Sequence, residues 1–340
     1  MALLAREVSL AVVTEFGVQE MLCRMADPFW FQSFGCVLGF DWHSSGVTTT
    51  VCGALKVGLK DVQHELGLYV AGGKGGTSRR TPQEIEAQGK RLNVDPAQLI
   101  YASRMSAKVD SSALQDGYQI YHHAFFFDPD GHWCVVQQGI NVDERYARRY
   151  HWLSDGPRDF VVEPHKAICC DRRGETLNMI AQESEEARSA TAVLAREMPG
   201  KLVMELQRLR ELELPSRHQV WLADVHPTRL EKVFLSTYER QTRNFEALLG
   251  MKGVGPKTIR ALSLLSEIVY GAQVSTRDPA RFSFAHGGKD GFPFPVDRTT
   301  YDRSIETLRM AIRQAKLGRR DKLDAFKRLA LWEKQAAGSG

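Results

Sequence analysis

The sequence lacks the features that mark membrane, secreted and zinc-binding proteins. Its six cysteines are scattered over 340 residues, and no two of them form the Cys-x-x-Cys pair of zinc sites and redox motifs, so we expect reduced, mostly buried thiols and no structural zinc. No apolar run is long enough to cross a bilayer, and the N-terminus lacks the basic region, apolar core and cleavage site of a secretion signal. These absences predict a soluble globular protein that stays in the cytoplasm and has no membrane partner.

The chain also lacks a strong charge of either sign and a complete nucleotide-binding motif. The formal net charge is +4, which by itself indicates no class of partner. Two Gly-Gly-Lys segments end at Lys74 and Lys289, but neither has the spacing of a P-loop, so nucleotide hydrolysis is not expected. Converging backbone N–H groups beside a lysine still suit an anion. We therefore expect Lys74, Arg79, Arg80 and Lys289 to contact phosphates; for the first segment the alternative is a flexible surface loop.

Alternation and turn residues predict an antiparallel β-hairpin in the first half of the chain. Residues 114–128 and 133–141 have the pattern of strands, and Asp-Pro-Asp-Gly at residues 128–131 is typical of the tight turn between them. From residue 177 onward the apolar spacing becomes that of long helices.

These patterns predict an α+β fold in two parts. We expect a mixed α/β domain over residues 1–170, which would hold any catalytic site, and an all-α domain over residues 171–335. The expected helices of the second domain lie at residues 177–196, 202–212, 227–241 and 245–270.

Residues 248–262 carry the strongest functional signal. Gly253 and Gly255 allow positive φ and close approach to another backbone, because neither has a Cβ. Pro256 then occupies the preferred first position of a helix, whose free N–H groups and positive dipole end suit a phosphate oxygen. The segment resembles the helix-hairpin-helix module, here at residues 245–270, which holds the DNA sugar-phosphate backbone without reading bases. The alternative is a glycine turn between two core helices. The residues expected to contact DNA are Gly253, Val254, Gly255, Lys257, Thr258 and Arg260.

Polar residues on the predicted hairpin are the best candidates for chemistry. Strand alternation places Gln119, Tyr121 and His123 on one face and His122 on the other. Apolar neighbours indicate buried strands, in which histidines and glutamines need hydrogen bonds or a function. Two interpretations stay open: a buried polar network that holds the hairpin together, and a site with a base, a cation and a metal.

Phosphodiester hydrolysis is the chemistry that would join such a site to a DNA-binding module. It needs a base or a metal to generate hydroxide, and positive charge beside the phosphate. The order and spacing of the residues match no nuclease motif. The candidate catalytic residues are Asp116, His122, His123, Lys108, Gln137, Asp41 and His43, and the candidate ligands of a divalent metal, Mg or Mn, are Asp116, Asp128 and His123. For Asp41 and His43 the alternative is that the aspartate caps a turn and orients the histidine.

Several motifs in combination resemble one prokaryotic family. They lie at residues 27–31, 38–46, 71–75, 115–118, 121–123, 135–139, 148–152 and 284–291. Over essentially its whole length the chain resembles the family catalogued as domain of unknown function 763. The resemblance implies a bacterial or archaeal protein with a role in DNA metabolism and assigns no activity. Members usually begin with a further segment containing Leu-His-Gly-Gly-Lys, which we expect to be missing here.

Three functions with DNA as the partner therefore remain. The first is a metal-dependent nuclease of DNA repair or processing, and the second is a noncatalytic DNA-binding or architectural protein. The third is a DNA glycosylase-like enzyme that would use Asp278 with Lys257, although an aspartate directly before a proline is also typical of a turn. The sequence leaves the oligomeric state open, and a homodimer is compatible with it.

Overall fold

The computed structural model describes residues 1–40, 46–155, 159–209, 211, 225–282 and 298–337. Three of the candidate residues, Asp41, His43 and Lys289, lie outside these ranges. Within the described ranges, no helix combines the length and the apolar character needed to span a bilayer.

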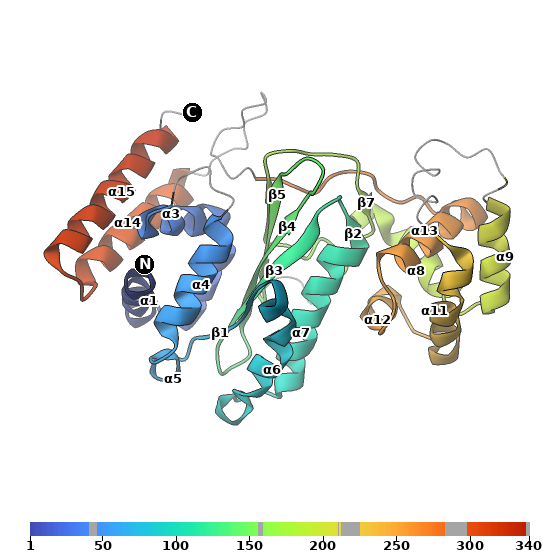
Figure 1. Cartoon of the computed structure of the whole chain (residues 1–340), viewed down its shortest axis with the longest axis horizontal. Coiled ribbons are helices and arrows are strands. Elements are labelled where there is room, and N and C mark those ends of the chain that lie inside the picture. Colours follow the sequence, from blue (N-terminus) through green and yellow to red (C-terminus); the bar gives the residue numbers. More distant parts are fainter. Residues whose placement is uncertain (41–45, 156–158, 210, 212–224, 283–297, 338–340) are drawn as a thin grey trace.

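An antiparallel sheet of five strands forms the centre of the molecule (Figure 1). In spatial order its strands are β1 (Tyr69–Lys74), β3 (Gln119–Phe127), β4 (Trp133–Ile140), β5 (Ala147–Leu153) and β6 (Ala167–Cys170). A separate short ladder pairs β2 (Leu114–Gln115) with β7 (Leu177–Asn178). Asp128 closes the turn between β3 and β4, because its Oδ1 accepts hydrogen bonds from the N–H groups of Asp130 (3.0 Å) and His132 (2.9 Å). The predicted antiparallel hairpin is confirmed.

A β-bulge changes the direction of side chains at the start of β3. The register shifts just before His122, so that Tyr121 and His122 share one partner position, Gln138 of β4. The Gln138 amide nitrogen donates to the Tyr121 hydroxyl at 2.7 Å. Tyr121 therefore lies with His122 and Gln138, and not with His123 as simple alternation had indicated.

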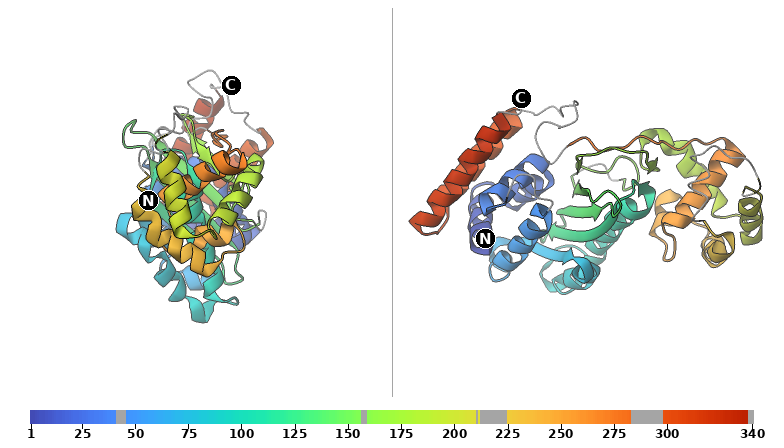
Figure 2. Two further views of the ribbon diagram at one scale, coloured as in Figure 1. Left: turned by 90° about the vertical axis from the view of Figure 1, so that its right-hand side faces the viewer. Right: turned by 45° about the horizontal axis from the view of Figure 1, so that its top comes forward.

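Helices from both ends of the chain cover one face of the sheet (Figures 1 and 2). They are α1 (Ala2–Phe16), α2 (Val18–Ala26), α3 (Pro28–Leu38), α4 (Val47–Leu59), α5 (Gln63–Leu66), α14 (Arg298–Gln314) and α15 (Arg319–Ala337). Asp27 caps α3 by accepting two hydrogen bonds from its first backbone N–H groups. Trp30, Leu308 and Trp332 belong to one buried core. Residues 298–337 thus pack with the N-terminal helices and not with the all-α domain in which we expected them.

The opposite face of the sheet is covered by α6 (Thr81–Glu86) and α7 (Pro96–Lys108). Asp95 caps α7, accepting from the N–H of Ala97 at 2.9 Å. Beyond α7 lies a helical lobe at the far end of the molecule from α15 (Figures 1 and 2). It comprises α8 (Glu185–Leu194), α9 (Pro199–Leu209), α11 (Pro227–Arg240), α12 (Phe245–Gly250) and α13 (Pro256–Tyr270). Phe125 of the sheet, Leu248 of α12 and Leu262 of α13 share one core.

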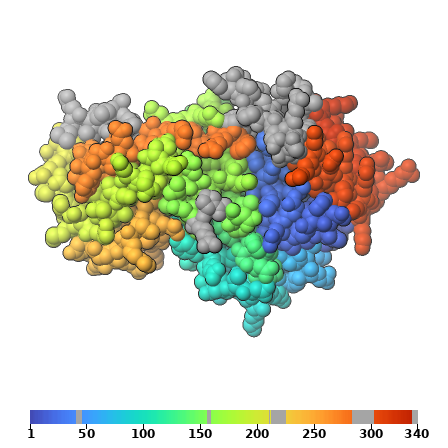
Figure 3. All heavy atoms as spheres, turned by 180° about the vertical axis from the view of Figure 1, so that it is seen from behind, coloured from blue at the N-terminus to red at the C-terminus, as the bar shows by residue number. Residues whose placement is uncertain are grey.

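The chain returns from the lobe to the edge of the sheet. After α13, residues 271–282 cross the surface toward the N-terminal helices (Figure 3). The N–H of Phe282 donates to the carbonyl of Ile168 at 3.2 Å, and the N–H of Cys170 donates to the carbonyl of Phe282 at 2.8 Å. This segment therefore extends along β6. The sequence had also indicated helix from residue 177, but residues 177 and 178 form β7, because they pair with β2.

Candidate nucleic-acid interface and buried polar sites

A sharp turn joins α12 to α13. Gly253 has a φ of 93°, in the left-handed region that favours glycine, whereas Gly255 is extended with a φ of −139°. Only the first of the two glycines therefore needs its conformational freedom for the turn. Pro256 occupies the first turn of α13 as expected, and no side chain caps this end among the described residues.

The inner side of this turn is anchored to the core. Met251 and Val254 are 7% and 1% exposed. The ammonium group of Lys108, at the end of α7, donates to the carbonyls of both residues, and burial lowers the pKa of Lys108. Gln115 adds a second anchor, because its amide nitrogen donates to the Pro256 carbonyl at 2.9 Å. Lys108, predicted to supply catalytic charge, thus holds the turn in place.

The expected DNA contacts of this segment divide into inward and outward groups. Thr258 is 2% exposed, and the Arg260 Nε donates to the side-chain oxygen of Gln115 at 2.9 Å. Val254 is buried as well. Thr258 and Val254 therefore face the interior, and Arg260 is half-buried. Along the outer rim the exposed residues are Lys252, Gly253, Pro256 and Lys257.

Asp116 is part of a buried ion-pair cluster. Its Oδ2 accepts from Arg148 at 2.8 Å and from the Tyr150 hydroxyl at 2.7 Å, and its Oδ1 accepts from the N–H of Tyr118 at 3.1 Å. Arg148 also donates to Asp278 at 2.6 Å. Burial is the largest influence on the pKa of Asp116 and raises it. The Oδ1 of Asp278 accepts from the N–H of Ala280 at 2.9 Å. The residue expected to bind a metal, Asp116, and the one expected to serve glycosylase chemistry, Asp278, are thus both engaged inside the protein.

His123 belongs to a chain of satisfied hydrogen bonds on the α7 side of the sheet. Its Nε2 lies 2.9 Å from the Ser103 hydroxyl and its Nδ1 lies 2.9 Å from the Gln137 side-chain oxygen. Gln137 in turn donates to Asp110 at 2.5 Å. Burial lowers the pKa of His123, which keeps the ring neutral. For His123 and Gln137 the geometry matches the buried-network interpretation.

His122 lies on the opposite face and differs from its neighbour. It is fully buried, and neither ring nitrogen has a hydrogen-bond partner within the part of the chain that the structure describes. Burial lowers its pKa to about 4, with smaller contributions from His123 and Lys74. An unpaired neutral imidazole in this position costs stability.

The three predicted metal ligands do not meet. Asp128 lies at the turn end of the hairpin, where its second oxygen contacts the His132 ring at 2.8 Å. Asp116 precedes the other end of β3, and both nitrogens of His123 are in use. In the described ranges no group of three or more His, Cys, Asp or Glu side chains is arranged to hold a metal ion.

The first Gly-Gly-Lys segment forms the end of β1 and leads into a 3-10 helix, in place of the surface loop that was the alternative. A Cβ on Gly72 would lie 2.2 Å from the carbonyl oxygen of His123, so glycine is needed for the strand pairing. Its N–H donates to Glu84 at 2.7 Å. The amide expected to bind phosphate is therefore occupied by a carboxylate of the protein. Arg79 and Arg80 follow on an exposed 3-10 helix.

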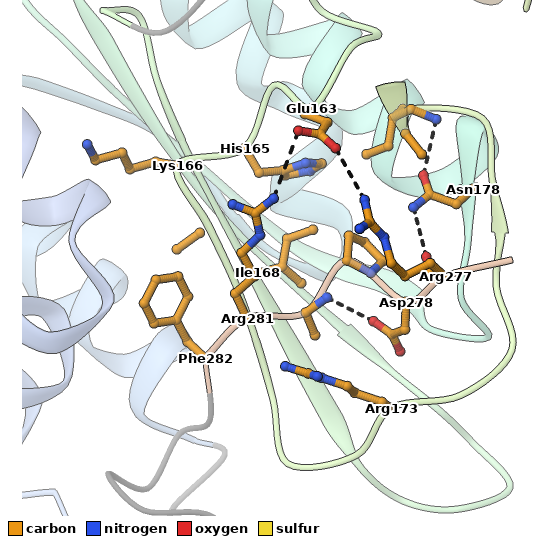
Figure 4. A pocket seen from close by; sticks show the side chains of 15 residues that line it. Glu163, His165, Lys166, Ile168, Arg173, Asn178, Arg277, Asp278, Arg281 and Phe282 are labelled. Atoms are coloured by element: carbon orange, nitrogen blue, oxygen red, sulfur yellow. Dashed lines mark hydrogen bonds and ion pairs between the residues drawn. The ribbon is translucent and has the colours of Figure 1, made fainter. Parts of the chain in front are cut away.

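The structure also assembles residues that no sequence motif singled out. A cavity of about 280 Å³ lies between the edge strand β6 and residues 277–282 (Figure 4). Glu163, His165, Arg277 and Arg281 line it. They come from segments far apart in the chain, and the pair of arginines flanking Asp-Pro-Ala at residues 278–280 was the one local sign of them.

Comparison with known proteins identifies the family and nothing closer. No curated protein and no solved structure matches the chain. One family model, described as protein of unknown function (DUF763), matches residues 1–296. This range includes the whole sheet, the turn between α12 and α13, and the cavity beside β6. The chain belongs to the DUF763 family.

Proposed function

We propose that this protein binds DNA through the sugar-phosphate backbone at the turn between α12 and α13. The observation that carries the proposal is the two-sided character of this turn. Its inner side is buried and hydrogen-bonded to Lys108 and Gln115, while its rim exposes Lys252 and Lys257 beside the start of a helix. A cationic rim beside a helix start that no described side chain caps suits phosphate oxygens.

The open space beside Gly255 supports the same proposal. A Cβ placed on Gly255 would meet no atom within 4 Å among the described residues, and its φ is one that any residue adopts. The fold therefore does not require glycine there. Close approach of an external backbone gives a reason for a missing side chain at this place.

The test is a fluorescence-anisotropy titration of a labelled duplex with the double variant Lys252→Ala/Lys257→Ala. We expect the affinity to fall about tenfold or more, and the slope of log affinity against log salt to decrease by about 2, because each lysine accounts for about one released counterion. The matched control is Lys60→Ala/Lys327→Ala, which has the same change of charge. It removes two exposed lysines, one directly after α4 and one within α15. Equal affinity in the two double variants would refute the assignment.

We propose binding without catalysis over the nuclease, because the buried candidates are already engaged. The side chains of Asp116 and His123 form hydrogen bonds with other residues inside the protein. Hydrolysis with Mg²⁺ or Mn²⁺ stays a prediction of the sequence, with Asp41 and His43 outside the described residues. Nicking of supercoiled plasmid with each ion separates the two functions. Cleavage that is abolished by Asp41→Ala or His43→Ala would favour the nuclease, and no cleavage with intact binding would favour the noncatalytic protein.

A further inference from the structure

The cavity beside β6 is cationic (Figure 4). Four cationic residues and two acidic ones, Glu163 and Asp278, line it. Asp278 is already paired with Arg148 at 2.6 Å, and Arg277 is shared between Glu163 at 3.6 Å and Glu183, which lies outside the lining, at 3.5 Å. The cationic lining residues are Lys166, Arg173, Arg277 and Arg281. An anion entering this cavity would therefore be attracted to it.

Glu163 occupies the place between two of these arginines. Its carboxylate lies 3.6 Å from Arg277 and 3.9 Å from Arg281, and Figure 4 shows the two guanidinium groups reaching it from different sides. Both separations are longer than a direct hydrogen bond. The side chains are 64%, 72% and 40% exposed for Arg277, Arg281 and Glu163. Exposed pairs of this kind contribute little, about 0–1 kcal/mol each, so a better anion can displace the carboxylate.

The backbone of Glu163 is unusual in a way that fits this role. Its φ is 41°, a left-handed value that is uncommon for a residue with a side chain. The N–H of Glu163 donates to the Ile180 carbonyl at 2.8 Å, which holds it in that conformation. Backbone strain of this type is found at ligand-binding sites more than elsewhere.

His165 adds an oriented hydrogen-bonding group to the cavity wall. Its Nε2 lies 2.5 Å from Oδ1 of Asp110, which is fully buried. The other oxygen of Asp110 accepts from Trp152 at 2.9 Å and from Gln137 at 2.5 Å. Because Nε2 is engaged by this carboxylate, Nδ1 is the second hydrogen-bonding atom of the ring. Nδ1 has no partner among the described residues, so it is the nitrogen left for a ligand.

We propose that this cavity binds a phosphate monoester, with Arg277 and Arg281 on its oxygens and His165 Nδ1 sharing a proton with it. Guanidinium groups pair with phosphate in fork-like geometry. A phosphate monoester loses its second proton near pH 6, so it can share that proton with an imidazole, whereas a carboxylate is fully ionised there. The volume lies at the small end of ligand cavities, which fits a phosphate group with part of a nucleotide. This site is separate from the turn between α12 and α13 and goes beyond the proposed DNA binding.

The test is isothermal titration calorimetry of the full chain at pH 6.5 with four probes: inorganic phosphate, thymidine 5′-monophosphate, thymidine and acetate. We expect saturable binding of the first two only. The double variant Arg277→Ala/Arg281→Ala should lose about tenfold or more of the affinity, because it removes two charge-assisted contacts. The matched control Arg208→Ala/Arg309→Ala removes two exposed, glutamate-paired arginines from α9 and α14 and should leave phosphate binding unchanged.

A second variant tests the role of Glu163 through an expected gain of phosphate affinity. Glu163→Gln keeps the size of the side chain and removes the competing charge, so phosphate affinity should rise about threefold or more. A 5′-phosphorylated oligonucleotide identifies the source: tighter binding than the mononucleotide means a nucleic-acid end, and equal binding means a free nucleotide. No saturable phosphate binding, or equal affinities in the two double-arginine variants, would overturn the proposal. Lys252→Ala/Lys257→Ala should leave phosphate binding unchanged, which keeps this test independent of DNA binding.

Discussion

Two of the described segments that combine glycines with a lysine, residues 72–74 and 253–257, are used by the fold in opposite ways. In residues 72–74 the first glycine, Gly72, is buried against the neighbouring strand. Gly72 leaves room for the His123 carbonyl, and its N–H binds Glu84. In residues 253–257, a Cβ on the last glycine, Gly255, would meet no atom within 4 Å in the part of the chain that the structure describes, and Lys257 is exposed beside it. The same residue types therefore serve strand pairing in one place and an open rim in the other.

The comparison shows that the role of a glycine depends on which atom occupies the space where a Cβ would lie. Where that neighbour is the protein's own backbone, glycine stabilises the fold. Where no atom of the protein lies there, the space is available to a ligand. Substitution to alanine therefore separates the two segments, because stability should respond in the first and affinity for DNA in the second.

The largest effect is expected for Gly72→Ala. Its Cβ would lie 2.2 Å from a backbone oxygen of His123 and 2.6 Å from the Thr81 hydroxyl, at a φ of 84°. Steric overlap and the left-handed backbone together should lower the free energy of unfolding by about 2–4 kcal/mol. Chemical denaturation followed by circular dichroism measures this. A loss below about 1 kcal/mol would show that the strand pairing can shift and would remove the contrast between the two segments.

A comparable effect is expected from the residue opposite Lys74 in the ladder, His122. Its folded-state pKa of about 4 lies below the unfolded value of 6.5, so the folded protein binds fewer protons between these pH values. The free energy of unfolding is therefore independent of this titration above pH 6.5 and decreases by about 3 kcal/mol as the pH falls toward 4.

The variant His122→Leu measures that decrease. Between pH 7 and pH 4 the wild type should lose about 3 kcal/mol more stability than the variant, as judged from denaturation curves at each pH. His123, whose pKa is also lowered by burial, remains in both proteins and acts as an internal reference. Parallel pH profiles for the two proteins would contradict the buried, unprotonated state of His122.

A smaller effect is expected for Gly255→Ala. The new Cβ meets no atom of the described residues within 4 Å, so the free energy of unfolding should change by less than about 1 kcal/mol. Affinity for duplex DNA should nevertheless fall about fivefold, because the methyl group moves a bound backbone away from the rim. Anisotropy titration and thermal melting of the same sample give both numbers. Unchanged affinity would mean that DNA does not approach at Gly255.

The sequence predicts those parts of the fold that depend on neighbours along the chain. Asp128 and Gly131 mark the hairpin turn, and Pro256 marks the start of α13. Residue 177 was read as helical because local spacing does not reveal that it pairs with Gln115. The packing of α14 and α15 against the N-terminal helices likewise depends on long-range contacts, which the apolar periodicity of a helix does not predict.

The candidate sites show the same limit. A list of polar residues on β3 and β4 predicts that they are buried together, but not which of them already have partners. The sequence makes Asp116 a candidate metal ligand, but it does not show the ion pair that Asp116 forms with Arg148 on β5. The cavity at β6 was missed because Asp110, His165 and Arg277 meet only in the folded protein. Residue type gives chemical capacity, and tertiary contacts decide how it is used.

The smallest effect, and the sharpest control on the comparison, is expected for Lys74→Met. Lys74 lies with its ammonium 5.8 Å from the centre of the Tyr121 ring and contributes to the low pKa of His122. Removing its charge should raise the His122 pKa slightly above 4, with burial still holding it below 6.5, as an NMR titration of the ring protons would show. DNA affinity should change less than about twofold, whereas Lys257→Met, with the same change of charge, should lower it more. If both substitutions lowered affinity equally, Lys74 would also contact a DNA phosphate. The difference between the two segments would then be limited to their glycines.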